Sequence, residues 1–539
     1  MFNYFYEKKI MIIVPHEDDE LNLVGGLLSN KYFNPENIWI VFTTNGDYLC
    51  NYKARIREAH KVAKKLHIPS DNLVFLGYAD QHIKEQSHIY ITHEPDILIS
   101  KKGNNKTFGP KKYDEFHFKR YNEHSKFNYE FLLQDFIDVI SLYEPEVIFV
   151  NDFDSHPDHR ASSLIFDKSM GIILKEKKDY YPLIYKGFAY PTAYKGVQDF
   201  NEINIYSTKF LTEPFSLSEM QNPFYTWNER VRFPVSQKRL LILNLWYQLL
   251  KKYKSQLIIR KSFSIINSDM IFFQRSSHNL CLNAKIEVSS GNSEYINDFM
   301  LFDISSIGNG DCKVPTLGNK AWIPDVIDSE KKITIAFEKK SRINKIIFYQ
   351  NLYDESKIDC LKIELSNEEE MQLKLNRTKT IMEINSTDEI EWIRIYVVSS
   401  VGQNAGLSEI EVLSYQKSIF EYFDVEINQV FSPQKIYMES LQKALDIKFY
   451  YYNGIETKIL DKNNILINSK PFSNDKLCFG HNHFTYNNSN FSKKVLILKF
   501  TKIRQLFNYI IVCLNKCILK TDIFVGRLFN KINRLIKRL

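Results

Sequence analysis

The feature that most constrains the fold is a regular alternation of apolar runs and helical stretches in the first 190 residues. The apolar runs are rich in aliphatic and β-branched side chains, as parallel strands buried on both faces are. The predicted strands are Lys9–Val14, Ile38–Thr44, Leu73–Leu76, Glu146–Val150 and Leu183–Ala189, and the predicted helices are Leu21–Ser29, Tyr52–His67, Tyr129–Leu142 and Arg160–Leu174. This order of strands and helices predicts an α/β Rossmann-like domain built on a parallel sheet.

At 539 residues the chain is too long for one core, and its pattern changes after the first domain. Residues 191–275 show further helical spacing, so we predict a first domain over 1–275. Residues 276–416 carry short runs with a period of two, such as KITIAFE and EWIRIYVVSS, which predict a C-terminal antiparallel β-sandwich domain. Residues 417–500 are predicted to be a small β-rich region of uncertain fold, and residues 501–539 a basic amphipathic helical tail.

The net charge of +7 is concentrated in that tail. Nine Lys and Arg and one Asp give residues 501–539 a charge of +8, so residues 1–500 carry about −1. We therefore expect no nucleic-acid partner. Seven scattered cysteines without a C-x-x-C pair argue against a disulfide framework and a cysteine-zinc site. With no visible signal peptide or membrane-spanning run, we expect a cytoplasmic protein, either free or peripheral at the inner face of the membrane.

Two polar clusters directly follow predicted strands. PHEDDE, residues 15–20, comes after the first strand, and NDFDSHPDHR, residues 151–160, comes after the fourth. Ligands of open parallel sheets bind outside the carboxyl ends of the strands, so the two clusters can meet in one crevice. The polar stretch between residues 81 and 126 is too long for an ordinary connection and is expected to be a lid or a binding loop.

The residue types in these clusters suit a catalytic divalent metal. His16 and Asp19 are three apart at the opening of a predicted helix, and His159 can supply a third ligand. Two imidazoles and one carboxylate, with one position left for water, match the open coordination of a catalytic zinc. A doubly charged ion would also explain why four carboxylates crowd at the end of one strand.

Three neighbouring side chains have the chemistry that hydrolysis needs. Asp18 can take a proton from water, and His156, oriented by Asp158, can donate a hydrogen bond to an oxyanion. Each cluster alone has a simpler explanation, because an acidic run favours the positive end of a helix dipole and isolated histidine pairs are common on surfaces. Two such clusters at the ends of parallel strands favour the catalytic interpretation.

The two motifs together resemble the PIG-L/LmbE family of zinc-dependent N-deacetylases, whose signatures are (P/A)-H-P-D-D-E and a later H-P-D-H. The similarity continues in VFTTNGD, RIREAHKVAKKL, LVFLGYAD and EPEVIFVNDFDSHPDHRASS, so it covers residues 8–190 and extends to about 275. Two positions depart from the family pattern. Glu17 stands where the commoner motif has Pro, and Asp154 stands where some relatives have an aromatic residue.

The resemblance implies a deacetylase domain with residue roles carried over by position. These are His16, Asp19 and His159 for Zn²⁺ or another divalent metal, Asp18 as general base, His156 as electrostatic stabiliser beside Asp158, and Asp47, Arg55 and Asp80 for the sugar hydroxyls. The implied reaction is hydrolysis of the N-acetyl group of an N-acetylglucosaminyl-type amino sugar, in surface-glycan or lipid-linked sugar metabolism. A soluble sugar–thiol precursor is the alternative substrate. An inactive glycan-binding scaffold is the alternative from another class, although the intact residue set argues against it.

The accessory parts suggest two further partners. KSRINKIIFYQN together with EWIRIYVVSSVGQNAGLSEIEVLS resembles a discoidin or galactose-binding-like sandwich, which implies either a glycan ligand or a packing domain without one. In the tail, apolar residues recur near helical spacing and Lys and Arg occupy much of the rest. That pattern predicts contact with an anionic membrane surface, and the alternative is a helix that docks on a partner or on its own chain.

Overall fold

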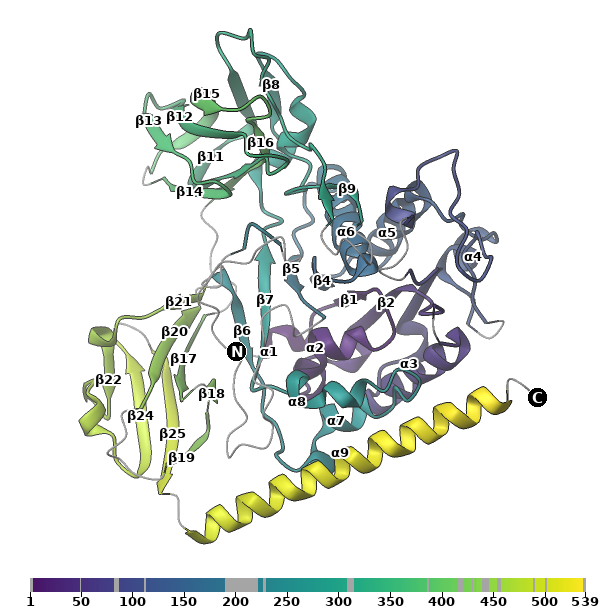
Figure 1. Cartoon of the computed structure of the whole chain (residues 1–539). Coiled ribbons are helices and arrows are strands. Elements are labelled where there is room, and N and C mark those ends of the chain that lie inside the picture. Colours follow the sequence, from purple (N-terminus) through teal and green to yellow (C-terminus); the bar gives the residue numbers. More distant parts are fainter. Residues whose placement is uncertain are drawn as a thin grey trace.

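The computed structural model of the chain describes residues 3–48, 50–81, 87–110, 113–189, 222–225, 229–307, 315–384, 387–414, 421–428, 430–431, 433–438, 445–452, 457–487, 490–499 and 502–536. Figure 1 shows an N-terminal α/β part, two β-rich parts beside it, and a long C-terminal helix along the outside of the molecule. The buried apolar side chains of the described residues form four clusters, of which two lie in the α/β part.

The N-terminal sheet has the strand order β3-β2-β1-β4-β5-β7-β6, and its first five strands run parallel. The predicted parallel sheet is thus confirmed, with helices in the predicted connections. The strands are β1 (Ile10–Val14), β2 (Ile38–Thr44), β3 (Leu73–Tyr78), β4 (Val147–Asn151) and β5 (Leu183–Gly187), and the helices are α1 (Asn3–Tyr6), α2 (Asp19–Ser29), α3 (Tyr52–Leu66), α4 (Phe116–Tyr121), α5 (Tyr129–Tyr143) and α6 (Pro157–Glu176).

Two antiparallel strands extend this sheet where the sequence predicted only helical material. β7 (Asp269–Arg275) pairs with β5, and β6 (Val231–Pro234) pairs with β7. The helices described between 229 and 275 are short, namely α7 (Leu245–Leu250), α8 (Ser262–Ile265) and two 3₁₀ turns. Residues 190–221 and 226–228 lie outside the described residues. A four-residue edge strand ending in Pro carries too little periodic signal for the sequence to reveal it.

Alternate side chains of β1 enter two different cores. Ile10, Ile12 and Val14 belong to the cluster that includes α2 and α3, whereas Met11 and Ile13 belong to the cluster that includes α5 and α6. This follows from the period of two of a strand, and it means that helices cover both faces of the sheet. The α/β part is therefore a three-layer structure, as expected from the apolar runs.

The next part of the chain forms antiparallel sheets, as predicted. β11 (Lys332–Gln350) lies between β15 and β8 at one end and between β14 and β16 at the other, and β12 joins β15 to β13. Two predicted runs therefore form one long strand, whose register shifts between Ala336 and Ser341. The partner strands are β8 (Lys285–Val288), β12 (Lys357–Leu365), β13 (Glu370–Lys374), β14 (Lys379–Glu383), β15 (Glu389–Val401) and β16 (Leu407–Ser414), and β9 (Ile304–Ser306) pairs with β10 (Thr316–Leu317) nearby.

The remaining strands form two small sheets with the orders β18-β17-β20-β21 and β19-β25-β24-β22-β23. These are β17 (Tyr422–Ile427), β18 (Val430–Phe431), β19 (Lys435–Met438), β20 (Ile447–Tyr452), β21 (Thr457–Ile459), β22 (Ile465–Ile467), β23 (Lys470–Pro471), β24 (Gly480–Tyr486) and β25 (Ser492–Lys499). Helix α9 (Lys502–Ile536) follows them, so the predicted helical tail is present. Among the helices of the described residues, none has an apolar stretch sufficient to span a bilayer.

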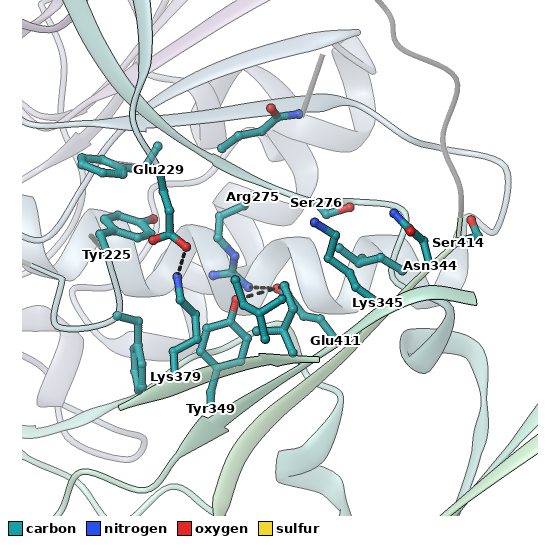
Figure 2. A pocket seen from close by; sticks show the side chains of 16 residues that line it. Tyr225, Glu229, Arg275, Ser276, Asn344, Lys345, Tyr349, Lys379, Glu411 and Ser414 are labelled. Atoms are coloured by element: carbon teal, nitrogen blue, oxygen red, sulfur yellow. Dashed lines mark hydrogen bonds and ion pairs between the residues drawn. The ribbon is translucent and has the colours of Figure 1, made fainter. Parts of the chain in front are cut away.

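A cavity of about 120 Å³ lies where the α/β part meets the sandwich (Figure 2). Charged side chains around it form ion pairs with one another. Arg275 Nη2 lies 3.3 Å from Glu411 Oε1, and Lys379 Nζ lies 2.5 Å from Glu229 Oε1. Because these pairs join residues far apart in the sequence, we interpret this region as a polar joint between the two parts.

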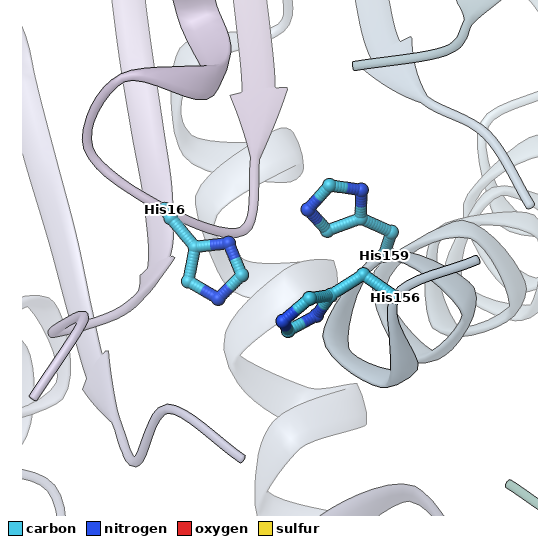
Figure 3. Close-up of side chains that lie close together, drawn as sticks. All are labelled: His16, His156 and His159. Atoms are coloured by element: carbon cyan, nitrogen blue, oxygen red, sulfur yellow. The ribbon is translucent and has the colours of Figure 1, made fainter. Parts of the chain in front are cut away.

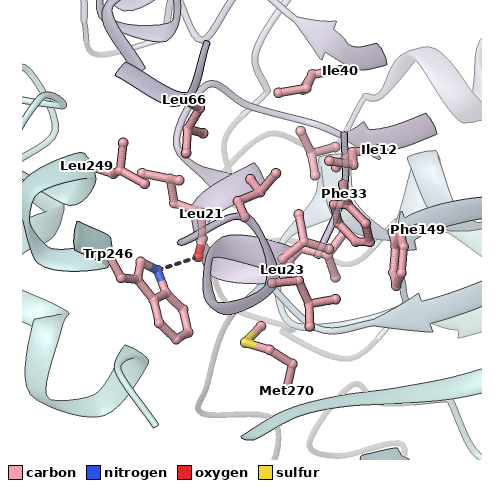
Figure 4. Packing of buried hydrophobic residues seen from close by; sticks show 14 of the residues in the cluster. Ile12, Leu21, Leu23, Phe33, Ile40, Leu66, Phe149, Trp246, Leu249 and Met270 are labelled. Atoms are coloured by element: carbon pink, nitrogen blue, oxygen red, sulfur yellow. Dashed lines mark hydrogen bonds between the residues drawn. The ribbon is translucent and has the colours of Figure 1, made fainter. Parts of the chain in front are cut away.

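Helix α2, which begins at Asp19, is held against the rest of the α/β part by a buried tryptophan. Trp246 Nε1 donates a hydrogen bond to the Leu21 carbonyl oxygen at 3.0 Å, and Met270 packs beside it (Figure 4). A Cβ atom on Gly25 would lie 2.2 Å from Trp246 Nε1. Glycine is therefore needed at this position for the indole to approach the helix.

We expect Gly25→Ala to lower the free energy of unfolding by about 1–3 kcal/mol, because the added methyl group overlaps the Trp246 indole. This exceeds the roughly 1 kcal/mol that alanine gains over glycine in a helix interior. Gly318→Ala, in the loop after β10, is the control for adding a methyl group without overlap, since the nearest atom to its added Cβ lies at 3.5 Å. Denaturant unfolding of both variants checks this, and equal stabilities would contradict it.

Candidate metal and catalytic site

The pairing of β1 with β4 brings the two polar clusters together. The two strands are neighbours in the sheet, with Ile13 opposite Val150, and both run toward the same edge. The chain leaves β1 into α2 and leaves β4 into α6, and these helices pack into the cores on opposite faces of the sheet. A crevice between such helices at the strand ends is the usual ligand site of this architecture.

Three donors converge in this crevice. Asp19 Oδ2 lies 2.9 Å from His16 Nδ1 and 3.2 Å from His159 Nε2, and all three side chains are buried. Figure 3 shows the rings of His16, His156 and His159 facing a common space, and one nitrogen of each lies within 4.8 Å of the others. The arrangement of two imidazoles and a carboxylate suits a divalent metal ion.

A second possible donor set shares part of this space. His16, Asp80, His156 and Asp158 also place one ligand atom each within 4.8 Å of one another. In that set, however, the Asp158 carboxylate already accepts hydrogen bonds from the Gln81 backbone N–H at 3.0 Å and from His88 Nε2 at 2.8 Å. The Asp19 carboxylate also accepts hydrogen bonds, from the His16 backbone N–H at 3.2 Å and from Asn22 Nδ2 at 3.3 Å, but its Oδ2 lies within 3.2 Å of a ring nitrogen of both His16 and His159. We therefore take the set with Asp19 as the candidate metal site.

The charges of the first set are balanced by protons on the imidazoles. Burial alone would lower the pKa of His159, but Asp154 and Asp19 outweigh it and raise that pKa to about 9. Likewise, burial would raise the pKa of Asp19, but His159 and His16 hold it well below its usual range. A divalent ion offers the same positive charge and would compete with protons for these nitrogens, so metal affinity would fall in acid.

Asp154 orients His159, a candidate metal ligand, which is a role that sequence reasoning did not give to Asp154. Its Oδ2 lies 2.8 Å from His159 Nδ1, so the other ring nitrogen faces Asp19. Metal-binding histidines typically donate their second ring N–H to such a carboxylate. Asp154 also accepts from the His156 backbone N–H at 2.9 Å, which shapes the turn into α6. Its position five residues before His159 was the available signal.

We expected the Asp158 carboxylate to orient His156, but it contacts two other histidines instead. Its carboxylate lies 3.0 Å from His16 Nε2 and 2.8 Å from His88 Nε2, but 3.9 Å from His156 Nδ1. Burial would raise the pKa of Asp158, yet the hydrogen bonds from His16 and His88 hold it well below its usual range. Asp158 therefore organises His16 with its side chain, and His88, from the long polar stretch, is a further residue of the site that the sequence did not single out.

His156 is oriented by the backbone instead. The Asp158 backbone N–H donates to His156 Nδ1 at 3.2 Å, so that nitrogen is an acceptor. Burial, followed by the charges of His16 and His159, lowers the pKa of His156 well below its usual value. A neutral ring with Nδ1 as acceptor carries its proton on Nε2, which is the tautomer that can donate a hydrogen bond.

The four consecutive carboxylates do not share one partner. Asp19 faces the histidines, but Glu17 Oε2 lies 3.1 Å from Arg55 Nε, and Glu20 accepts from Tyr253 at 2.5 Å and from the Asp18 backbone N–H at 3.0 Å. Burial raises the pKa of Glu17 to about 7 and that of Glu20 to about 8. A metal ion therefore does not by itself explain the crowding. The four side chains also point in different directions, Arg55 pairs with Glu17, and the raised pKa values favour the protonated forms of Glu17 and Glu20.

Asp18 lies at the open side of the site in a strained conformation. Its φ of 130° is unusual for a residue other than glycine, and such strain is often found at functional positions. Its Oδ1 lies 3.3 Å from Arg55 Nη2. Burial, followed by the charge of Asp19, raises the pKa of Asp18 to about 7.

A cavity of about 280 Å³ opens at this site. Of the three residues expected to face the sugar, Arg55 and Asp80 line the cavity, with Arg55 Nη1 at 3.6 Å from Asp80 Oδ2. Asp47 is not among the lining residues, and its Oδ1 instead accepts from the Asp80 backbone N–H at 3.1 Å. The opposite wall, which the sequence did not predict, comes from residues 256–258, 260 and 261.

The fold and the donor set define an α/β protein with a candidate metal site at the carboxyl ends of parallel strands. The model of a family described as PIG-L: GlcNAc-PI de-N-acetylase matches residues 11–169. This segment contains β1 to β4, both polar clusters and most of α6. The resemblance to this family is therefore confirmed over these residues. No curated protein matches the chain.

Several solved structures show a more distant likeness. N,N'-diacetylchitobiose deacetylase from Pyrococcus horikoshii, complexed with its inhibitor MPG, is 12% identical with a TM-score of 0.28, and the match covers 51% of this chain and 86% of that one. The family 32 CBM of NanJ from Clostridium perfringens, in complex with galactose, is 15% identical with a TM-score of 0.18, covering 24% and 92%. Discoidin II from Dictyostelium discoideum is 12% identical with a TM-score of 0.19, covering 27% and 60%.

We expect the metal-free protein to bind about one divalent ion per chain, because one set of donors converges at Asp19. His159→Ala should weaken binding at least tenfold, and Asp154→Asn, which releases the His159 ring, by about 10–100-fold. Titration with Co²⁺ followed by its visible absorption checks both. His93→Ala is the control, since that histidine is exposed and pairs with Glu130 away from the site. Equal affinities of His159→Ala and His93→Ala would contradict the assignment.

Proposed function

We propose that the protein is a zinc-dependent N-deacetylase that hydrolyses the N-acetyl group of an N-acetylglucosaminyl-type amino sugar. The observation that carries this proposal is the position of the Asp19 carboxylate between His16 and His159, with Asp18 beside it in the same cavity. The donors lie within the segment that matches the PIG-L family model, described as a GlcNAc-PI de-N-acetylase. Amide hydrolysis of this kind needs a metal, a base and an oxyanion donor in one place.

Zinc is the metal that the donor set favours, although another divalent ion can occupy such a site. His16, Asp19 and His159 would hold it, which leaves a fourth position open. When bound, the ion would polarise the acetyl carbonyl and make water more acidic. The buried hydrogen bond between Asp154 and His159 would keep that ligand in place.

Asp18 is the proposed general base and, after the attack, the acid that protonates the departing amine. It lines the cavity, and its raised pKa of about 7 makes it a better proton acceptor than an ordinary carboxylate. Arg55 Nη2, at 3.3 Å from Asp18 Oδ1, limits the directions in which the carboxylate can turn. The strained backbone at this position also fixes the direction of its side chain.

His156 is the proposed donor to the oxyanion. The Asp158 backbone N–H donates to His156 Nδ1, so the His156 ring can donate from Nε2. At 17%, His156 is the most exposed of the three imidazoles. A donor fixed in advance at the position where negative charge develops stabilises the transition state. Asp158 contributes by hydrogen bonding to His16 and to His88.

The finer details of the substrate are also proposals. A lipid-linked or surface-glycan substrate fits the presence of the sandwich and of α9, and a soluble sugar–thiol precursor is the alternative. The cavity walls offer Arg55, Asp80 and Gln256 as groups that can hydrogen-bond to hydroxyls. Glycan binding by residues 276–416 and a cytoplasmic location stay predictions.

We expect acetate release from an N-acetylglucosaminyl compound, lost on chelation and restored by Zn²⁺. Asp18→Asn should lower kcat at least about 100-fold, because the base is removed, while zinc stays bound. Asp71→Asn, at an exposed position outside the site, is the matched control and should leave kcat unchanged. The measurement is an acetate assay on N-acetylated sugars, both free and lipid-linked, alongside the zinc content of each preparation.

A different outcome would favour the scaffold alternative. If wild type and Asp18→Asn both fail to release acetate from every sugar in the set while glycans still bind, the proposed deacetylase activity is wrong. If Asp18→Asn loses zinc together with activity, Asp18 acts on the metal site rather than as a base.

A further inference from the structure

Helix α9 docks on the α/β part through one face, which carries a stripe of polar residues beside the partly buried Ile518, Leu519 and Ile523. Leu241 N–H donates to Asn515 Oδ1 at 3.0 Å, and Tyr247 donates to Asp522 Oδ2 at 2.8 Å. Asn530 Nδ2 donates to the Lys254 carbonyl oxygen at 3.2 Å. Asn515, Asp522 and Asn530 are spaced by about two turns each, so they form one stripe along the helix. The structure thus realises the expected alternative in which the helix docks on its own chain.

The opposite side of α9 is apolar and lies open to solvent in the described chain. Six of its residues form what we call the outward face: Leu506, Phe507, Leu514, Phe524, Leu528 and Ile532, which are between 46% and 66% exposed. At 3.6 residues per turn these six fall within an arc of roughly 100°, away from the docked stripe. Figure 1 shows α9 running along the outside of the molecule. Exposed apolar patches of this kind commonly mark sites that bind another protein or a membrane.

The charges of α9 are sorted between its sides. Lys516, Lys520, Arg527 and Lys531 are exposed and fall within an arc of roughly 60° along one border of the outward face. The single acidic residue of the tail, Asp522, is on the docked side, where Lys251 Nζ lies 2.6 Å from it. The open side of the helix therefore combines an apolar surface with positive charge alone.

We propose that the outward face of α9 binds the surface of an anionic lipid bilayer, with the helix lying in the plane of the interface. An apolar stripe can enter the boundary between headgroups and acyl chains, and the row of cations can contact anionic headgroups at its border. A protein groove would need carboxylates along only one border to match the same pattern. Because the docked stripe keeps its hydrogen bonds to the α/β part, the helix need not leave its position to bind.

The position of α9 also places the candidate site near the proposed membrane surface. The meaning of this arrangement for catalysis rests on the proposed function. Leu257 lines the site cavity, and its Cδ2 is the nearest atom to a Cβ built on Gly526 of α9, at 2.3 Å. The segment from Lys254 to Lys261 therefore lies between α9 and the cavity. A bilayer bound to the outward face would hold this wall of the cavity close to the membrane surface.

The test is co-sedimentation of the purified full chain with vesicles of phosphatidylcholine, alone or mixed with phosphatidylglycerol. We expect binding only to the mixed vesicles, weakened by salt. The double substitution Phe524→Ser with Leu528→Ser should weaken binding by more than about tenfold, and Lys520→Gln with Arg527→Gln by about tenfold. The control is Val326→Ser with Ile327→Ser, two exposed apolar residues outside α9, which should bind as wild type does.

Two outcomes would overturn the proposal. Wild type that stays in the supernatant with the mixed vesicles excludes membrane binding. Wild type that is dimeric by light scattering, and becomes monomeric in Phe524→Ser with Leu528→Ser without sedimenting with vesicles, shows that a second copy covers the face. Thermal unfolding of each variant should match wild type, because the substituted side chains are exposed. Acetate release from a soluble N-acetylated sugar, measured on the same preparations, separates failure of this proposal from failure of the proposed activity.

Discussion

The parallel pairing of β1 with β4 is the constraint on which the candidate site depends. Their register places Ile13 opposite Val150, and the loops that begin after these strands carry His16 and His159. A slip of one residue would move one loop by about 3.3 Å and turn its side chains to the other face. Asp19 could then no longer lie within 3.2 Å of a nitrogen from each histidine. Successive side chains of β1 are buried in two different cores, and a slip would move each of them into the wrong core.

Later parts of the chain complete a site that lies mostly within residues 11–169. Tyr253 holds Glu20, and Gln256 Nε2 donates to the Glu17 carbonyl oxygen at 2.7 Å, so the loop after α7 fixes the start of α2. On the other side, Arg160 Nη1 donates to the Ile307 carbonyl oxygen at 2.5 Å, and Tyr90 donates to Asp303 at 2.6 Å. Residues 303–307, between β8 and β11, thus support both the turn with the histidines and the long polar stretch.

The sequence predicted what local periodicity can encode. Apolar runs gave the five parallel strands, and polar residues at two strand ends gave His16, Asp19 and His159 as neighbours, because the fold places carboxyl ends at one edge. It did not predict that His88 would reach Asp158, or that Gln256 would line the cavity, since those contacts join residues 70 or more positions apart and leave no periodic trace. The antiparallel strands β6 and β7 were also missed. β6 has four residues, too few to show a period, and β7 is buried along most of its seven residues, so it does not alternate between apolar and polar side chains.

The acidic run after β1 shows why charge counting from sequence misleads. Four adjacent carboxylates suggest four negative charges around one ion, but the backbone turn at Asp18 sends them in different directions. Glu17 forms an ion pair with Arg55, and Asp19 lies between His16 and His159. Burial raises the pKa of Glu20 to about 8, which favours its protonated form. Of the four carboxylates, Asp19 lies between the imidazoles and Asp18 lines the cavity, which are the positions that the proposed metal ligand and the proposed base need. Glu17, which replaces the commoner Pro, therefore forms an ion pair with Arg55 and is not part of the candidate donor set.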